Sequence, residues 1–222
     1  MLVMWMENLA CNSMEAKKYG IALHTTTPEL GLAISNSIDT RSQVWNLERE
    51  LSSHLHAYLM EFIKPQTWKD IAFIAVAKGP GGFTGTRIGM VAARTLGQQL
   101  NIPVFAISTL AAVAKMKINE KLDTDIIAVQ MPAQRGQLFG AVYKSISDEV
   151  GINTLLNDTV FTPEAWQSKL ASFDCYDLVE AKSGLAATVT SILQLAYSDW
   201  QQGRRPIWSE ALPFYGQHPV DI

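Results

Sequence analysis

Residues 78–89 read Lys-Gly-Pro-Gly-Gly-Phe-Thr-Gly-Thr-Arg-Ile-Gly, a glycine-rich stretch between two different hydrophobic patterns. The apolar run at 71–77 precedes it and has the length and the β-branched composition of a buried strand. A helical pattern follows over 86–100, and a second strand-like run follows over 103–107. The stretch therefore predicts a right-handed strand–helix–strand unit of a mostly parallel sheet, with the glycines in the first turn.

This glycine turn is a candidate phosphate site. Glycine lets another group approach the backbone closely, and the amides at the start of the following helix favour an anion. Neither common phosphate motif is complete, because no Lys-Ser/Thr pair follows and Thr84 stands where the dinucleotide fingerprint needs glycine. The candidate nucleotide- or phosphate-facing residues are Gly79, Gly81, Gly82, Thr84 and Gly85.

The amino-acid sequence of this stretch resembles the G-P-G-S-F-T-G-x-R-I-G signature of the TsaB (YeaZ) family. The resemblance extends from about Tyr19 to about Ala114, and more thinly to Tyr215. That family is the non-catalytic partner in bacterial threonylcarbamoyladenosine modification of tRNA. The resemblance implies an α/β fold of the actin-like ATPase (ASKHA) type, a ribonuclease H-like duplication of two small α/β lobes with mixed sheets.

The hydrophobic layout also indicates two similar halves. A strand–turn–strand pattern at 20–34 recurs at 125–143, with an offset of 106 residues from Ile21 to Ile127. We expect a flexible N-terminal extension over 1–18, an N-terminal lobe with the glycine turn over 19–108, and a C-terminal lobe and tail over 109–222.

Two acidic positions of the family pattern are missing from this chain. His24 stands at the first turn and Pro132 at the second, where the family carries aspartate. Magnesium prefers oxygen ligands, so the loss of these carboxylates removes its natural anchor. We therefore expect no catalytic residue and no metal site here, with no cofactor bound to the chain alone, although ATP or ADP and magnesium could bind at a joint with a partner.

Two helices carry the candidate partner interface. Leu51, Leu55 and Tyr58 belong to an apolar stripe in the predicted helix at 48–64. A line of small residues, Gly89, Ala93 and Gly97, runs along the next helix and would let a partner helix approach closely. Both stripes could instead pack against the chain's own sheet, and the sequence leaves the two interpretations open.

The resemblance implies a particular set of partners. The chain would pair with a TsaD-like catalytic subunit and, with a TsaE-like ATPase, support transfer of threonylcarbamoyl to the adenosine next to the anticodon of ANN-decoding tRNAs. It would be a homodimer when alone, and it would meet tRNA only through the complex. On this hypothesis the chain is an accessory subunit and not itself an enzyme.

Two other functions remain as alternatives. An autonomous small-molecule kinase of actin-like fold would need carboxylates at the positions of His24 and Pro132. A metallopeptidase-like protein would need histidines with ligand spacing, but His54 and His56 are two residues apart and point to different sides of a helix. The remaining histidine, His218, is distant from both.

Composition narrows the class of protein further. The net charge is −3, and 18% of the 222 residues are charged, so a basic stripe for tight tRNA binding is not expected. Two cysteines without a C-x-x-C pattern imply neither a disulfide framework nor a zinc knuckle. No apolar run reaches the length of a membrane span. These features predict a cytoplasmic protein with no membrane association.

Overall fold

The computed structural model describes residues 19–120, 124–146 and 151–217. The predicted N-terminal extension at 1–18 and His218 lie outside the described residues. No helix in the described part of the chain has both the length and the apolar character that crossing a bilayer requires.

The first sheet has five strands in the order β3-β2-β1-β4-β5. β1 and β2 are an antiparallel hairpin with Ile21 opposite Ile34, whereas β1 with β4 and β4 with β5 are parallel. The predicted strand–helix–strand unit around the glycine turn is therefore confirmed. The strand bounds are Tyr19–His24 for β1, Glu29–Ser35 for β2, Thr40–Asn46 for β3, Ile71–Ala77 for β4 and Val104–Ile107 for β5.

The second sheet repeats the arrangement of the first with four strands in the order β8-β7-β6-β9. Its hairpin β6–β7 is antiparallel and its β6–β9 pair is parallel, as in the corresponding strands of the first sheet. The predicted duplication and the mixed α/β fold are confirmed. The sequence did not predict β8, whose exposed and half-buried residues lack a strong apolar pattern. The bounds are Ile126–Pro132 for β6, Leu138–Ser145 for β7, Ile152–Phe161 for β8 and Asp177–Glu180 for β9.

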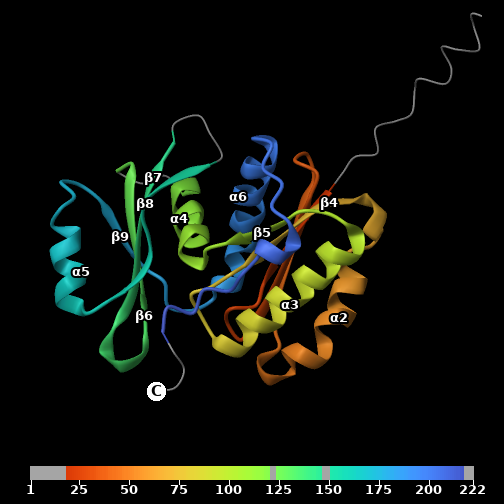
Figure 1. Cartoon of the computed structure of the whole chain (residues 1–222), viewed down its shortest axis with the longest axis horizontal. Coiled ribbons are helices and arrows are strands. Elements are labelled where there is room, and N and C mark those ends of the chain that lie inside the picture. Colours follow the sequence, from red (N-terminus) through yellow and green to blue (C-terminus); the bar gives the residue numbers. More distant parts are fainter. Residues whose placement is uncertain (1–18, 121–123, 147–150, 218–222) are drawn as a thin grey trace, which may run out of the picture.

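Helices cover both faces of each sheet (Figure 1). α2 and α3 lie side by side on the outer face of the first sheet, and α5 lies on the outer face of the second. α4 and α6 stand between the two sheets and pack on each other. The bounds are Leu51–Phe62 for α2, Phe83–Leu100 for α3, Thr109–Asn119 for α4, Pro163–Leu170 for α5 and Val189–Gln201 for α6.

The two central helices interlock the lobes. α4 follows the first sheet in the chain but packs on β6 and β7, whereas α6 follows the second sheet but packs on β1 and β2. β1 accommodates this because Ile21 and Leu23 face the core under α2 and α3, while Ala22 belongs to the cluster with Val189 and Ile192 of α6. The division at residue 109 stays a prediction, and the packing joins the two lobes closely.

Two helices begin directly after a residue whose side chain caps them. The Ser108 hydroxyl accepts a hydrogen bond from the Ala111 amide at 3.1 Å and so begins α4. Thr162 caps α5 in the same way, with Pro163 at its first position. α3 begins at Phe83, three residues earlier than the helical pattern at 86–100 predicts, so Thr84 and Gly85 belong to its first turn.

Candidate functional site

A cleft of about 940 Å³ lies where the glycine turn meets the turns of both hairpins. Four of the five candidate phosphate-facing residues line it, namely Gly81, Gly82, Thr84 and Gly85. Gly79 is not among the lining residues. Its φ of +103° needs glycine, and a Cβ there would overlap the backbone carbonyl of Phe214 in the tail.

The glycines of the turn bring α3 against the β1–β2 turn. The Gly82 amide donates to the Thr26 carbonyl at 2.7 Å, and the Thr25 hydroxyl donates to the Gly85 carbonyl at 2.8 Å. A Cβ at Gly81 or Gly85 would overlap the carbonyl oxygen of Thr26 or Thr25. The sequence predicts that a second group approaches the backbone closely at these glycines. At Gly81 and Gly85 that group is the chain's own first hairpin.

The N-terminus of α3 opens on this cleft without a side-chain cap, because its N-cap residue is Gly82. The first amides of a helix have no partner within it, and the helix dipole adds a partial positive charge there. Arg49 lines the same cleft, and so does Lys182, although the Lys182 ammonium also pairs with Glu180 at 2.9 Å. These donors suit an anionic group such as a phosphate.

The same cleft is poorly equipped for magnesium. His24 is fully buried, and burial lowers its pKa to about 3, so its ring is neutral at neutral pH. Among the described residues that line the cleft, Glu48 is the one with a carboxylate. The described ranges contain no group of three or more His, Cys, Asp or Glu side chains that could hold a metal ion. The donor set therefore fits a phosphate better than a hydrated cation.

Glu48, Arg49 and Lys182 are site residues that the sequence reasoning missed. The sequence pattern assigned Glu48 and Arg49 to the predicted helix at 48–64, but they belong to a 3₁₀ turn, and the Glu48 amide donates to the Pro28 carbonyl at 2.8 Å. Lys182 follows β9 in the other lobe. No local signal joins these residues, because only the meeting of the two lobes brings them to one cleft.

The small-residue stripe of α3 faces the interior of the protein. Ala93 is fully buried, and a Cβ at Gly89 or Gly97 would overlap the side chain of Thr25 or Val104. Leu51 and Leu55 of α2 are also buried in the core. The expectation of a partner interface is corrected for Leu51, Gly89, Ala93 and Gly97, whose small size or apolar character lets α2 and α3 lie close on the first sheet, whereas Leu55 also lines the outer side of these two helices.

The outer side of the same two helices carries an apolar groove of about 530 Å³ between α2 and α3. Met60 and Val91 border it with exposed fractions of 57% and 62%. Tyr58, the remaining predicted interface residue, is half-buried with its ring centroid 4.8 Å from that of Trp45. We call this feature, bordered by Met60 and Val91 and floored by Leu55 and Ile88, the α2–α3 groove.

His54 and His56 are both exposed on α2. The ring of His54 lies 3.8 Å from the Glu50 carboxylate, an ordinary surface contact one helical turn away. The described part of the chain thus gives no support to the metallopeptidase alternative.

The geometry defines a two-lobed α/β protein with two mixed sheets and a cleft between the hairpin turns. A family model described as "TsaD: tRNA N6-adenosine threonylcarbamoyltransferase" matches residues 50–177, more than half of the chain. The chain belongs to this family, and several of its curated relatives carry the name TsaB.

Two relatives and one solved structure illustrate the similarity. The "tRNA threonylcarbamoyladenosine biosynthesis protein TsaB" of Bacillus subtilis is 40% identical over 76 residues, which cover 34% of this chain and 32% of that protein. The protein of the same name from Escherichia coli is 27% identical over 134 residues, which cover 60% and 57%. The match thus spans about a third of the first relative and somewhat more than half of the second. YeaZ from Pseudomonas aeruginosa shares the fold, with a TM-score of 0.73, 22% identity, and coverage of 89% of this chain and 99% of that one.

Proposed function

We propose that this chain is a non-catalytic subunit of tRNA threonylcarbamoyladenosine biosynthesis. It pairs with a TsaD-like catalytic subunit and, together with a TsaE-like ATPase, supports transfer of threonylcarbamoyl to the adenosine next to the anticodon of ANN-decoding tRNAs. Its relatives named TsaB support the pathway. The proposal places the protein in the cytoplasm, where its tRNA substrate is modified.

The observation that carries the pairing is the α2–α3 groove. Met60 and Val91 are large apolar side chains more than half exposed, and they border one continuous groove between neighbouring helices. Exposed apolar surface of this kind is typical of a protein–protein contact, and helices are the natural elements to fill it. The TsaD-like subunit is the proposed occupant, and a second copy of this chain takes its place when the chain is alone.

The accessory role is supported by the chemistry of the glycine-turn cleft. A neutral, buried His24 and Pro132 stand where an actin-like enzyme needs carboxylates, and Glu48 is the acidic residue among the described lining residues. No residue of this chain makes or breaks a bond in the proposal. The cleft instead presents the α3 N-terminus and Arg49 to the phosphates of ATP or ADP near the joint with the partner.

The pairing is tested with the double variant Met60→Glu/Val91→Glu. Two carboxylates buried in an apolar interface carry a large desolvation cost, so affinity for the TsaD-like subunit should fall about a hundredfold or more in light scattering and titration calorimetry. The matched control is Leu155→Glu on β8, a leucine with 45% exposure on the other lobe. Wild-type affinity in the double variant would contradict the proposed interface.

The accessory role has its own test. In a reconstituted reaction with the TsaD-like and TsaE-like subunits, Glu48→Gln should leave the rate of tRNA modification within about threefold of wild type, because the carboxylate transfers no proton. A loss of about a hundredfold or more at unchanged complex affinity would instead assign Glu48 a chemical role. Turnover of ATP by the isolated chain above background would favour the kinase alternative.

A further inference from the structure

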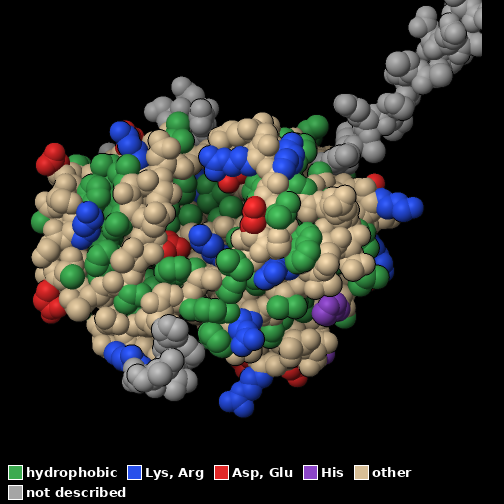
Figure 2. Space-filling model, in the orientation of Figure 1, with side chains coloured by type: hydrophobic (Ala, Val, Ile, Leu, Met, Phe, Trp, Pro, Cys, Tyr) green, Lys and Arg blue, Asp and Glu red, His purple; other side chains and the backbone are tan. Residues whose placement is uncertain are grey.

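A second cavity, of about 420 Å³, lies between β7 and β8 on one side and the central helices on the other. Among the described residues, none lines both this cavity and the glycine-turn cleft. Its apolar wall includes Ile107, Leu195 and Phe214. Basic and acidic side chains gather around the hollow between the two lobes (Figure 2). Two of the charged residues that line the cavity, Lys78 and Asp158, could each form a further polar contact with a ligand.

Asp158 is held rigidly by one of its two carboxylate oxygens. The Ser108 hydroxyl donates to Oδ1 at 2.8 Å, and the Tyr143 hydroxyl donates to the same oxygen at 3.0 Å. Oδ2 is buried and has no hydrogen-bond partner among the described residues. Buried carboxylate oxygens normally accept at least one hydrogen bond, so Oδ2 lacks a donor that a ligand could supply.

Lys78 supplies a cation on the same wall. Its backbone is fixed at both ends, because its amide donates to the Ile107 carbonyl at 2.8 Å and its carbonyl accepts from the Phe214 amide at 2.7 Å. The positive charge of Lys78 acts on Asp158 to lower the carboxyl pKa against the larger effect of burial, yet within the described residues Lys78 forms no ion pair. The cavity thus holds two opposite charges that do not neutralise each other directly.

The other charged pair of this cavity is already satisfied. Arg204 Nη1 lies 3.1 Å from Asp199 Oδ1, so their charges are paired with each other. Of the charged lining residues, Lys78 and Asp158 therefore remain for a ligand. Their opposite signs favour a molecule that carries both an anionic and a cationic group.

We propose that this cavity binds a small zwitterion, an α-amino acid with an apolar side chain, whose ammonium pairs with Asp158 and whose carboxylate pairs with Lys78. The apolar side chain lies against Ile107, Leu195 and Phe214. The volume is within the range of roughly 300–1,000 Å³ that small-molecule sites occupy. This site goes beyond the proposed role in tRNA modification, because neither the pairing with a partner nor the glycine-turn cleft requires it.

The ligand chemistry is tested on the wild-type full chain by titration calorimetry. The probes are L-leucine, L-valine, L-methionine and L-phenylalanine, followed by two analogues of leucine that each lack one charge. These are 4-methylpentanoate, which has no ammonium, and 3-methylbutylamine, which has no carboxylate. We expect at least one amino acid to bind, and we expect each single-charge analogue of leucine to bind about tenfold or more weakly than leucine.

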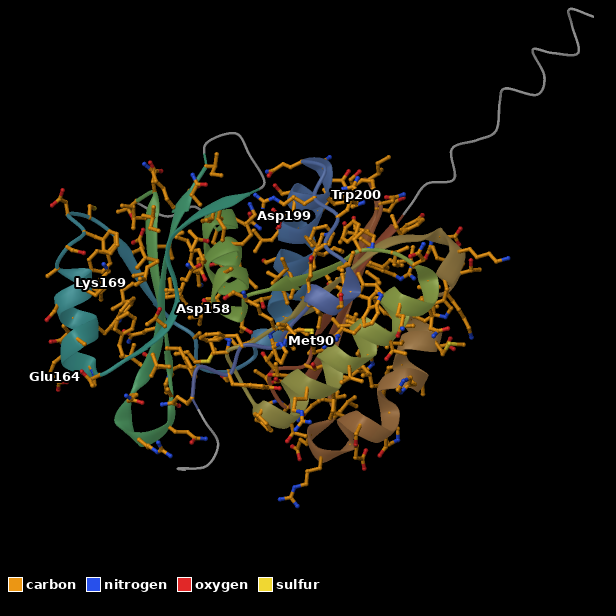
Figure 3. All side chains as sticks on the ribbon, viewed as in Figure 1. Met90, Asp158, Glu164, Lys169, Asp199 and Trp200 are labelled. Carbon is orange, nitrogen blue, oxygen red and sulfur yellow. The ribbon has the colours of Figure 1, made fainter. Side chains whose placement is uncertain are left out.

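The residue assignment is tested with Asp158→Asn and Lys78→Met. Both variants should weaken amino acid binding about tenfold or more, because each removes one charge-assisted contact. The matched controls are Glu164→Gln and Lys169→Met, which remove the same charges from α5 on the far side of the second sheet (Figure 3) and should leave affinity unchanged.

Three outcomes would overturn the proposal. They are a Kd weaker than about 10 mM for all four amino acids, equal binding of leucine and its analogues, and full affinity in both cavity variants. The analogue series uses wild-type protein, so it decides the question even if Asp158→Asn does not fold.

Discussion

Gly89 of α3 lies directly against Thr25, the residue that follows β1, with no room for a side chain between them. The Thr25 hydroxyl also donates to the Gly85 carbonyl at 2.8 Å, one helical turn earlier. These contacts hold the start of α3 on the β1–β2 turn and so shape one wall of the glycine-turn cleft. The glycines of this segment are thus required first by packing within the chain.

Replacement of Gly89 by alanine tests this contact. Alanine favours a helix by roughly 1 kcal/mol over glycine, but its Cβ would overlap the Thr25 side chain, and overpacking of this kind costs about 1–3 kcal/mol. We expect a net loss in the free energy of unfolding, measured by urea denaturation. Gly82→Ala is the control, because a Cβ there would lie 3.4 Å from the Thr26 carbonyl, an ordinary contact. Equal stability of the two variants would contradict the packing role of Gly89.

Acid pH should destabilise the fold through His24. Its pKa is lowered from 6.5 to about 3 by burial, so below pH 6.5 the unfolded chain binds a proton that the folded chain does not. The stabilising contribution is complete above pH 6.5 and is lost as the pH falls toward 3, by at most about 1.4 kcal/mol per pH unit. The measurement is urea denaturation of wild type and His24→Gln across this range. If the free energies of unfolding of the two proteins changed with pH in parallel, the lowered pKa of His24 would be contradicted.

Asp158 should give a pH effect of the opposite sign. Burial raises its carboxyl pKa above the usual 3.8, so the folded chain holds this proton more tightly than the unfolded chain. Stability from this group is greatest at low pH and declines as the pH rises through the interval above 3.8. The free energy of unfolding of Asp158→Asn, taken relative to that of wild type, should therefore increase as the pH rises. It should become constant once the wild-type carboxyl is ionised. A difference that does not change with pH would refute the raised pKa.

Nucleotide binding at the glycine-turn cleft, in the complex with the TsaD-like subunit, should depend little on magnesium. The described lining residues of the glycine-turn cleft include one carboxylate, Glu48, whereas Arg49 and the α3 N-terminus suit phosphate. We expect ATP to bind with similar affinity in magnesium and in EDTA, and Arg49→Met to weaken binding about tenfold while Lys169→Met does not. A strict requirement for magnesium, measured by calorimetry, would point to metal ligands outside this set.

Much of the fold could be predicted because hydrophobic periodicity and turn residues within short segments indicate its helices and strands. The apolar run at 71–77, the glycine turn and the helical pattern after it lead to β4, α3 and β5, and the repeated hairpin leads to the second lobe. β8 escaped prediction because its residues are exposed or half-buried, so burial leaves no regular hydrophobic pattern in its sequence.

The candidate site could be predicted only in part. Gly81, Gly82, Thr84 and Gly85 do line a cleft, but Lys182 reaches it from the opposite lobe, and no spacing in the chain encodes that meeting. The stripe through Ala93 was open to two interpretations, since small residues permit close packing on a sheet and on a partner alike.

By itself the sequence determined the order and type of most elements, the duplication and the absence of family carboxylates at His24 and Pro132, because periodicity and residue identity are local properties. Only the tertiary structure decided that Gly89, Ala93 and Gly97 face inward, and that Lys78 and Asp158 share a cavity. The physical reason is that burial and the pairing of charges depend on which distant segments pack together, and here α4 and α6 each cross to the other lobe's sheet.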